Sequence, residues 1–208
     1  MLKRKKLVLA SGSPRRKELL GHLNINFNVH PSDVVEETDF TAPTDVVIDL
    51  AKLKGDDIFS KEDSHSLIIS SDTIVVIDDK ILGKPNDREH AKEMLESLSG
   101  RTHEVYTAVY MKASGPDGEV KSKAFYVKTE VEFEMISDDI MKLYLDSNDP
   151  YDKAGAYGIQ NQGLLFVKQI KGSYSNVVGF PLSDFIREFK GFIDDLGYGD
   201  IKLAELFE

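Results

Sequence analysis

The segment 10–16 has the residue types of an anion site. It reads Ala-Ser-Gly-Ser-Pro-Arg-Arg and follows a short apolar run. Ser13 before Pro14 is typical of a helix N-cap and first helical position, and the free N–H groups of a helix start attract anions. Arg15 and Arg16 then fall in the first turn, where each cation opposes the helix dipole by about 0.3–1 kcal/mol. We interpret this pair as binding a phosphate chain; the alternative is two solvated arginines on an ordinary amphipathic helix.

A second candidate is the acidic residue of Ser71-Asp72-Thr73, which separates two apolar runs at 67–70 and 74–77. A carboxylate at a strand break, between hydroxyl groups, is placed to activate water or to hold a hard cation. An Asp at such a break also commonly forms a turn, so this position alone leaves both interpretations open.

Two loop-forming stretches carry further polar groups. Lys84 lies in Gly83-Lys84-Pro85, where it is either a point charge for phosphate or a surface hairpin lysine. The turn-rich stretch 149–160 is longer than most connections in compact domains, and such loops usually serve a site. It offers the charge of Lys153 and the amide of Gln160. The acidic pair Glu36-Glu37 has, by itself, the character of a solvated surface pair.

The elements that would position these residues alternate along the chain. Period-two and apolar runs predict strands, and apolar residues three and four apart predict helices. We expect a loop at 172–181. Strands are predicted at 6–10, 27–30, 67–70, 74–77, 102–112, 120–133 and 164–170; helices are predicted from 14, over 44–59, from 87, from 137 and over 181–196. This alternation indicates an α/β or α+β fold with a mixed sheet, in one domain over 1–208.

Composition excludes several classes of protein. The 208 residues are 41% hydrophobic and 30% charged, which is typical of a folded domain, and the net charge of −10 disfavours nucleic-acid and membrane-surface partners. There is no Cys, and the five His show no H-E-x-x-H spacing, so thiolate and zinc chemistry are not expected. The basic start is followed by too short an apolar run for a signal peptide, and we expect a cytoplasmic protein.

Six segments, in order, resemble the Maf proteins, also called Maf-like or septum formation proteins. The resemblance as a whole extends from residue 7 to about residue 190, and the tail after Leu196 lies outside it. The segments are 9–16, 71–75, 82–85, 98–103, 152–160 and 176–182. The resemblance implies a two-lobed mixed α/β fold similar to the inosine triphosphatases, with the nucleotide in the cleft between the lobes. It also implies metal-dependent hydrolysis of a nucleoside triphosphate between the α and β phosphorus atoms.

The resemblance further implies roles for particular residues. Asp72 would be the proton acceptor that activates water, and Glu36 would assist Asp72 in holding Mg²⁺ or Mn²⁺, with the register against Glu37 open. A homodimer is common in the family. The residues that would contact the substrate and its phosphates are Ser11, Ser13, Arg15, Arg16, Lys54, Lys84 and Lys153.

Three positions are similar to the branch of the family that hydrolyses dTTP and UTP: Arg15, Thr73 and Gln160. The carboxamide of Gln160 can answer both the N3 donor and the O4 acceptor of uracil or thymine. Two other functions stay open. One is the same chemistry on another nucleotide, such as 7-methylguanosine triphosphate. The other is a nucleotide-binding regulator of cell division that turns over no substrate.

Overall fold

The computed structural model describes residues 5–199 and 202–207. The first four residues of the basic start lie outside the described residues, as do 200, 201 and 208. The chain forms two compact units, each assembled from separate stretches of sequence. Unit 1 comprises 1–72, 108–126 and 179–208, and unit 2 comprises 73–107 and 127–178. None of the described helices is long and apolar enough to cross a membrane.

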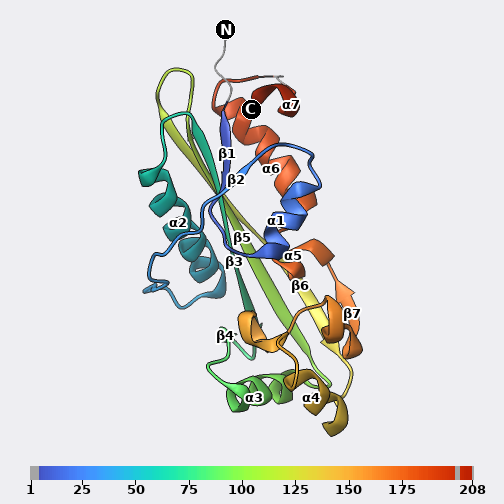
Figure 1. Cartoon of the computed structure of the whole chain (residues 1–208). Helices are drawn as coiled ribbons and strands as arrows, with labels where there is room; N and C mark the ends of the chain where they lie inside the picture. Colours follow the sequence, from blue (N-terminus) through green and yellow to red (C-terminus); the bar gives the residue numbers. More distant parts are fainter. Residues whose placement is uncertain (1–4, 200–201, 208) are drawn as a thin grey trace. The chain divides into compact units, whose positions relative to one another are not determined.

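Helices and strands alternate over most of the described chain, as the sequence predicts (Figure 1). The strands are β1 (Lys6–Leu9), β2 (Asn28–Val29), β3 (Ser66–Ile77), β4 (Lys80–Leu82), β5 (Thr102–Ser114), β6 (Val120–Phe133) and β7 (Val167–Lys171). The α-helices are α1 (Pro14–Gly21), α2 (Pro43–Lys61), α3 (Arg88–Leu98), α4 (Asp138–Leu145), α5 (Tyr174–Val178), α6 (Leu182–Asp195) and α7 (Leu203–Leu206). Short 3₁₀ turns are η1 (Pro150–Asp152), η2 (Ala154–Ala156) and η3 (Asn161–Leu165).

The described strands form a mixed sheet in the order β2-β1-β3-β5-β6-β7, with β4 paired to β3. β1 is parallel to both β2 and β3, whereas β4 is antiparallel to β3 and β7 is antiparallel to β6. Asp78 and Asp79 make the tight turn between β3 and β4 with φ of 49° and 59°. The sheet contains both parallel and antiparallel strand pairs and is accompanied by helices, which confirms the predicted mixed α/β class.

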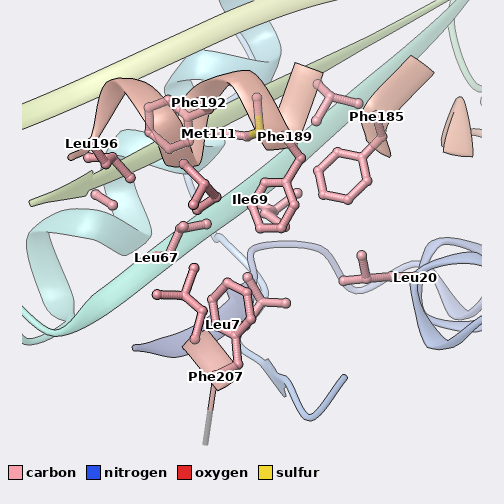
Figure 2. Packing of buried hydrophobic residues seen from close by; sticks show 14 of the residues in the cluster. Leu7, Leu20, Leu67, Ile69, Met111, Phe185, Phe189, Phe192, Leu196 and Phe207 are labelled. Atoms are coloured by element: carbon pink, nitrogen blue, oxygen red, sulfur yellow. The ribbon is translucent and has the colours of Figure 1, made fainter. Parts of the chain in front are cut away.

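The core of unit 1 lies on two faces of its strands. Alternate residues of β1 point to opposite sides, so Leu7 and Leu9 join one cluster while Val8 and Ala10 join another. The first cluster receives a row of aromatic rings from α6, which Figure 2 shows packed over Leu67 and Ile69 of β3. The second receives Ile58 of α2. Strands covered on both faces become continuous apolar runs, which explains the composition of β1 and β3.

The core of unit 2 is aromatic. Phe133 of β6 makes edge-on contacts with His103, Tyr157 and Phe166, whose ring centroids lie 4.7, 4.7 and 4.9 Å away. Tyr144 of α4 packs against Phe166 in the same way. These rings connect β5, β6, α4 and the 149–165 stretch, and therefore fix the long turn-rich loop to the strands below it.

Three predicted element boundaries are wrong. The expected strand break at Ser71-Asp72-Thr73 does not exist, because β3 is continuous from Ser66 to Ile77. The segment expected as a loop at 172–181 contains α5. The strand expected at 164–170 begins later, because Leu164 and Leu165 belong to η3. At Asp72 the pairing within the sheet overrides a residue type that disfavours strands. At α5 the Asn176 backbone N–H donates to Ser173 Oγ at 3.2 Å, which is a local capping bond.

Candidate active site

Asp72 lies inside β3, at a point where the strand exchanges partners. Residues 66–69 of β3 pair with β1, and residues 75–77 pair with β4, so Asp72 falls between the two pairings. Its side chain is only 8% exposed. A buried carboxylate requires charge partners or hydrogen bonds, because removing it from water costs several kcal/mol by general estimates.

Lys54 of α2 supplies that partner. Its Nζ donates to Asp72 Oδ1 at 2.5 Å, and the lysine side chain is itself 12% exposed. The close approach of α2 to β3 brings this contact about. A Cβ atom on Gly55 would stand 2.6 Å from Ser70 Oγ and 2.5 Å from Tyr110 Cδ1, so a residue with a side chain would push the helix away. Ser70 Oγ also donates to the Ala51 carbonyl at 2.6 Å.

Glu36 joins the same ammonium group. Its Oε2 lies 2.8 Å from Lys54 Nζ, and its side chain is 48% exposed. Of the pair Glu36-Glu37, it is therefore Glu36 that meets the predicted lysine. The extended segment that carries it is tied to α2 by Ser32 Oγ, which donates to Asp57 Oδ2 at 2.7 Å. Lys54 thus holds one buried and one exposed carboxylate together.

Arg16 adds a second cation beside these carboxylates. Its Nε donates to the Gly179 carbonyl at 3.0 Å and its Nη1 donates to Ser11 Oγ at 3.3 Å. Ser71 Oγ donates to the same Gly179 carbonyl at 3.1 Å. Burial lowers the pKa of the Arg16 guanidinium, and the charges of Asp72 and Glu36 act in the opposite direction. We call Arg16, Glu36, Lys54 and Asp72 the Asp72 cluster.

The start of α1 has the capping residues that the sequence predicts. Ser13 is the N-cap residue, Pro14 takes the first helical position, and no acidic residue lies in the first turn. The Ser13 hydroxyl makes no capping bond; instead the Ser13 backbone N–H donates to Ser11 Oγ at 3.3 Å. Arg15 is partly buried next to Arg16, whose pKa its charge lowers. The two arginines therefore oppose each other electrostatically at a helix start that also repels cations.

In unit 2 the loop that carries Lys84 is hydrogen-bonded to the loop that carries Lys153. The Gly155 backbone N–H donates to the Gly83 carbonyl at 3.0 Å, and Gly155 itself has φ of +67° over the Val75 side chain. Lys84 is exposed. Lys153 Nζ donates to the Asp149 carbonyl at 2.5 Å and to Asp152 Oδ1 at 2.6 Å. Acceptors of its own loop therefore already bind the Lys153 ammonium group.

Gln160 sits in a loop that depends on two glycines. A Cβ on Gly163 would stand 1.8 Å from the Gly158 carbonyl oxygen, and a Cβ on Gly158 would stand 2.8 Å from Lys153 Cε. The backbone therefore closes tightly around Gln160 and against the stem of Lys153. Thr73, the last predicted specificity residue in this unit, shares a 3.0 Å hydrogen bond with Thr107.

The Asp72 cluster can accommodate a divalent cation only with help from a ligand. Among the described residues, no three His, Cys, Asp or Glu side chains form a group that could hold a metal ion. Glu36 and Asp72 both reach the Lys54 ammonium and present hard carboxylate oxygens. Mg²⁺ is commonly bound by one or two carboxylates together with water and substrate phosphates. This donor set fits Mg²⁺ or Mn²⁺ in the presence of a phosphorylated ligand.

The sequence patterns do not predict several buried, hydrogen-bonded polar residues of the two units. Ser71 bonds the Gly179 carbonyl, and Thr107 and Asn176 are fully buried and hydrogen-bonded in unit 2. Each is a small polar residue in an apolar or turn-rich stretch, which is a weak signal. Asn176 lies in a segment that the resemblance covers, but nothing in its type indicates its contacts.

A mixed α/β fold that brings one buried and one exposed carboxylate, an ammonium and a guanidinium together is typical of proteins that handle phosphorylated ligands. The chain belongs to the Maf-like protein family, whose sequence profile matches residues 6–192. It is 43% identical over 190 residues to a protein of Lachnoclostridium phytofermentans named dTTP/UTP pyrophosphatase, covering 91% of this chain and 96% of the relative. A Bacillus cytotoxicus protein of the same name is 44% identical, covering 90% and 96%.

Solved structures show weaker likenesses. The nucleoside-triphosphatase / dITP/XTP pyrophosphatase of Mycobacterium abscessus is 12% identical, with a TM-score of 0.42 over 91% of this chain and 96% of its own. The Ham1 protein of Staphylococcus aureus is 18% identical, with a TM-score of 0.39 over 61% of this chain and 72% of its own. Likenesses at these TM-scores carry no argument about the site.

Proposed function

We propose that this protein hydrolyses dTTP and UTP to the nucleoside monophosphate and pyrophosphate. The observation that carries the proposal is the Asp72 cluster, in which a buried carboxylate shares one ammonium group with Glu36 and lies beside Arg16. Family membership and the names of two relatives at 43% and 44% identity support the choice of reaction.

In the proposed reaction Asp72 removes a proton from the attacking water. Lys54 already occupies Oδ1, so the proton goes to Oδ2. The buried pairing fixes the orientation of the carboxylate, which general base catalysis requires. The anhydride bond between the α and β phosphorus atoms breaks, and pyrophosphate leaves with additional negative charge.

Cations of the chain neutralise this charge. We assign Arg15 and Arg16, the Ser11 and Ser13 segment, and Lys84 to the phosphates, and Lys54 to the reacting group. Lys153 would contact phosphate by exchanging its exposed partner Asp152, whose side chain is 56% exposed. Glu36 and Asp72 are the residues that would hold a divalent cation, which would supply Lewis-acid chemistry when bound.

Specificity is assigned to Arg15, Thr73 and Gln160. The close approach of Gly163 to the Gly158 carbonyl constrains the backbone of the loop that carries Gln160. A carboxamide has both a donor and an acceptor, so this one side chain can answer both kinds of group on the base. Nucleotides that present the wrong pattern would leave buried polar groups unpaired, and such mismatches are rejected strongly.

The first test is product analysis with purified protein. With Mg²⁺ or Mn²⁺, UTP and dTTP should yield monophosphate and pyrophosphate. Asp72→Asn should reduce kcat by about 100-fold to 10,000-fold, the range of general base contributions. Asp79→Asn is the matched control: it makes the same chemical change in the exposed turn of the same hairpin, where Asn suits the φ of 59°.

Four outcomes would contradict the proposal. Release of inorganic phosphate with a diphosphate product would change the reaction, and unchanged turnover in Asp72→Asn would remove Asp72 as the base. A preference for 7-methylguanosine triphosphate over UTP, unaltered in Gln160→Glu, would change the substrate. Tight nucleotide binding with no pyrophosphate release under either metal would favour a regulatory binding protein.

The proposal also includes a cytoplasmic homodimer without nucleic-acid or membrane partners. The family resemblance supports the dimer, and the net charge of −10 supports the absence of polyanionic partners. Analytical ultracentrifugation of the full chain measures the oligomeric state, and a monomer at micromolar concentration would contradict it.

A further inference from the structure

The Lys54 ammonium group contacts two carboxylates at once. Its Nζ lies 2.5 Å from Asp72 Oδ1 and 2.8 Å from Glu36 Oε2, so the two carboxylate oxygens are no farther apart than these two distances together allow. The lysine side chain is 12% exposed, and the lack of a side chain at Gly55 lets its helix lie close to β3. The fold of unit 1 therefore holds one cation against both oxygens.

The same oxygens are the acceptors that a divalent cation would use. Among the residues that the structure describes, no three His, Cys, Asp or Glu side chains form an alternative group for a metal ion. An ion bound to Glu36 and Asp72 would therefore compete with the Lys54 ammonium group for both carboxylates. The ammonium group would also repel the ion, because like charges a few ångströms apart interact strongly near a protein surface.

The formal charge of the Asp72 cluster gives a free ion little attraction. The two carboxylates are balanced by Lys54 and by Arg16, which lies within the electrostatic reach of both. Mg²⁺ gives up its water reluctantly, and a site without net charge offers little in return. A nucleoside triphosphate changes this balance, because its phosphates bring several negative charges and further oxygen ligands together with the ion.

The two contacts of Lys54 differ in how easily they exchange. The Asp72 side chain is 8% exposed, so its separation from a cation is unfavourable. The Glu36 side chain is 48% exposed, and water can replace its partner at little cost. The contact with Glu36 is therefore the one that an incoming ion breaks, while Lys54 stays with Asp72.

We propose that Lys54 keeps the Glu36 and Asp72 pair closed to a free divalent cation, and that the ion enters only with the phosphates of a nucleotide, when Glu36 exchanges Lys54 for the ion. Lys54 then sets the order of binding in addition to neutralising charge. This inference rests on the proposed function, which supplies the nucleotide. It predicts a gain when Lys54 is removed: the protein acquires a metal site that needs no nucleotide.

Binding of Mn²⁺ without nucleotide tests this prediction. The affinity for MnCl₂ alone is measured at about pH 8, above the ordinary pKa of carboxyl groups, from the electron paramagnetic resonance signal of free Mn²⁺. Lys54→Met should bind Mn²⁺ at least about tenfold more tightly than the wild type, because a like charge is removed from the site. Lys52→Met removes the same charge from an exposed position of the helix and should stay within about twofold of the wild type. Equal affinities of Lys54→Met and the wild type would overturn the inference.

Two glutamine substitutions locate the acquired site. In the Lys54→Met protein, Glu36→Gln should abolish the gain in Mn²⁺ affinity. Glu37→Gln makes the same change at the neighbouring exposed position and should keep the gain. A gain that survives Glu36→Gln would place the ion elsewhere and overturn the inference. The comparison also decides between the two glutamates whose register the sequence leaves open.

Glu36→Gln in the otherwise wild-type protein keeps the inference falsifiable if Lys54→Met does not fold, which circular dichroism would show. If Lys54 closes the pair, this variant should keep the nucleotide-free Mn²⁺ affinity of the wild type within about twofold, since it alters only an exposed charge. A larger loss would mean that the pair binds Mn²⁺ with Lys54 in place, and would overturn the inference.

The same variant should behave differently with nucleotide. Calorimetry measures binding of the complex of Mn²⁺ with α,β-methylene-UTP, which cannot be hydrolysed between the α and β phosphorus atoms. Glu36→Gln should weaken this binding at least about tenfold, as for loss of a group that supports a metal ion, and Glu37→Gln should not. Equal affinities of the Glu36→Gln variant and the wild type would show that Glu36 does not take the ion, and would overturn the inference.

Failure of the inference is distinguishable from failure of the proposed function. A wild type that does not hydrolyse UTP with Mn²⁺ would contradict the proposed function, whereas the comparison of Lys54→Met with the wild type contains no nucleotide and still decides the role of Lys54. Wild-type binding of free Mn²⁺ as tight as that of Lys54→Met would contradict the inference alone, because hydrolysis does not depend on which ligand binds first.

Discussion

The Nζ atom of Lys54 contacts two carboxylates from different parts of the chain, Asp72 at 2.5 Å and Glu36 at 2.8 Å. Two carboxylates close together repel each other unless a cation lies between them. Lys54 lies between Asp72 and Glu36, and in the proposed reaction its charge also neutralises the substrate.

Lys54→Met should keep the length of the side chain and remove its charge. We expect kcat/KM for UTP to fall by about 100-fold or more, as for loss of one electrostatic contact in a preorganised site. Lys52→Met, at an exposed position of the same helix, is the control and should retain activity. Equal activities of the two variants would show that Lys54 does not act in the reaction.

His103 predicts a pH dependence of stability. Burial lowers the pKa of its imidazole from 6.5 to about 4, and its Nε2 shares a 2.6 Å hydrogen bond with Tyr157 Oη. The folded pKa is the lower one, so the unfolded chain takes up the proton first. The stabilisation is complete above pH 6.5 and is lost as the pH falls to 4, by about 3 kcal/mol. Urea unfolding measures it.

The variant His103→Phe isolates this contribution. It lacks the titrating group while keeping an aromatic ring of similar size among Phe133 and Tyr157. Its free energy of unfolding should change less between pH 6.5 and 4 than that of the wild type, whatever its absolute stability. The same pH dependence in both proteins would mean that His103 is protonated in the folded state.

At the scale of elements, the contact of α2 with β3 decides where Lys54 stands. Gly55→Ala would place a Cβ 2.5 Å from Tyr110 Cδ1 and 2.6 Å from Ser70 Oγ. The helix must move, and we expect the free energy of unfolding to fall by about 1–3 kcal/mol. Because Lys54 moves with the helix, kcat should fall by more than this loss of stability accounts for. Thermal unfolding and UTP hydrolysis measure the two effects.

Gly191→Ala in α6 is the matched control. The added Cβ would meet only the end of the flexible Lys123 side chain, at 3.5 Å. Alanine is a better helix former than glycine, so this variant should be as stable as the wild type or more stable by about 0.5–1 kcal/mol. A loss of activity as large as that of Gly55→Ala would mean that the α2 contact is not what matters.

Much of the element order could be predicted from local patterns. Asp87 caps α3 by accepting from the His90 backbone N–H at 2.8 Å, and Phe185, Phe189 and Phe192 fall on the buried side of α6. The continuity of β3 through Asp72 could not be predicted, because Asp disfavours strands and the pairing of β3 with β1, β4 and β5 is a property of the sheet and not of the local sequence.

The site could be predicted only in part. Ser13 as the N-cap residue and Pro14 at the first helical position follow from capping rules, and the structure confirms both; anion binding there stays a prediction. The pairing of Lys54 with Asp72 and Glu36 is different, because no periodicity relates residues that far apart on a helix, a strand and an extended segment. Family resemblance supplied those residues, and their roles stay predictions. The hydrogen bond between Thr73 and Thr107 depends on side-chain geometry that neither source contains.

At the scale of the whole molecule, Leu206 and Phe207 near the end of the chain belong to the larger hydrophobic cluster of unit 1. Lys5 pairs with Phe207, and the Lys5 backbone N–H donates to the Leu206 carbonyl at 2.7 Å. The Phe207 ring stacks on Phe189 of α6, with ring centroids 5.9 Å apart. Figure 2 shows both residues within the same cluster of buried side chains. This segment lies beyond the family match, which stops at residue 192.

Phe207→Ala should therefore reduce stability although it touches no proposed site residue. Burial of Phe207 leaves 4% of its surface exposed, and truncation of such a ring costs about 3 kcal/mol or more. Phe40→Ala, at 53% exposure, should change the free energy of unfolding by less than about 0.5 kcal/mol. Equal effects in chemical denaturation would place Phe207 outside the core.

The boundaries of the two units fall at 72/73, 107/108, 126/127 and 178/179, so the chain passes from one to the other four times. Neither unit corresponds to a single stretch of gene. A recombination event with one crossover cannot exchange one unit for that of a relative, and neither half can be cloned alone by trimming an end. Exchanging either complete unit therefore requires a crossover at each of these four boundaries, one of which is the peptide bond between Asp72 and Thr73.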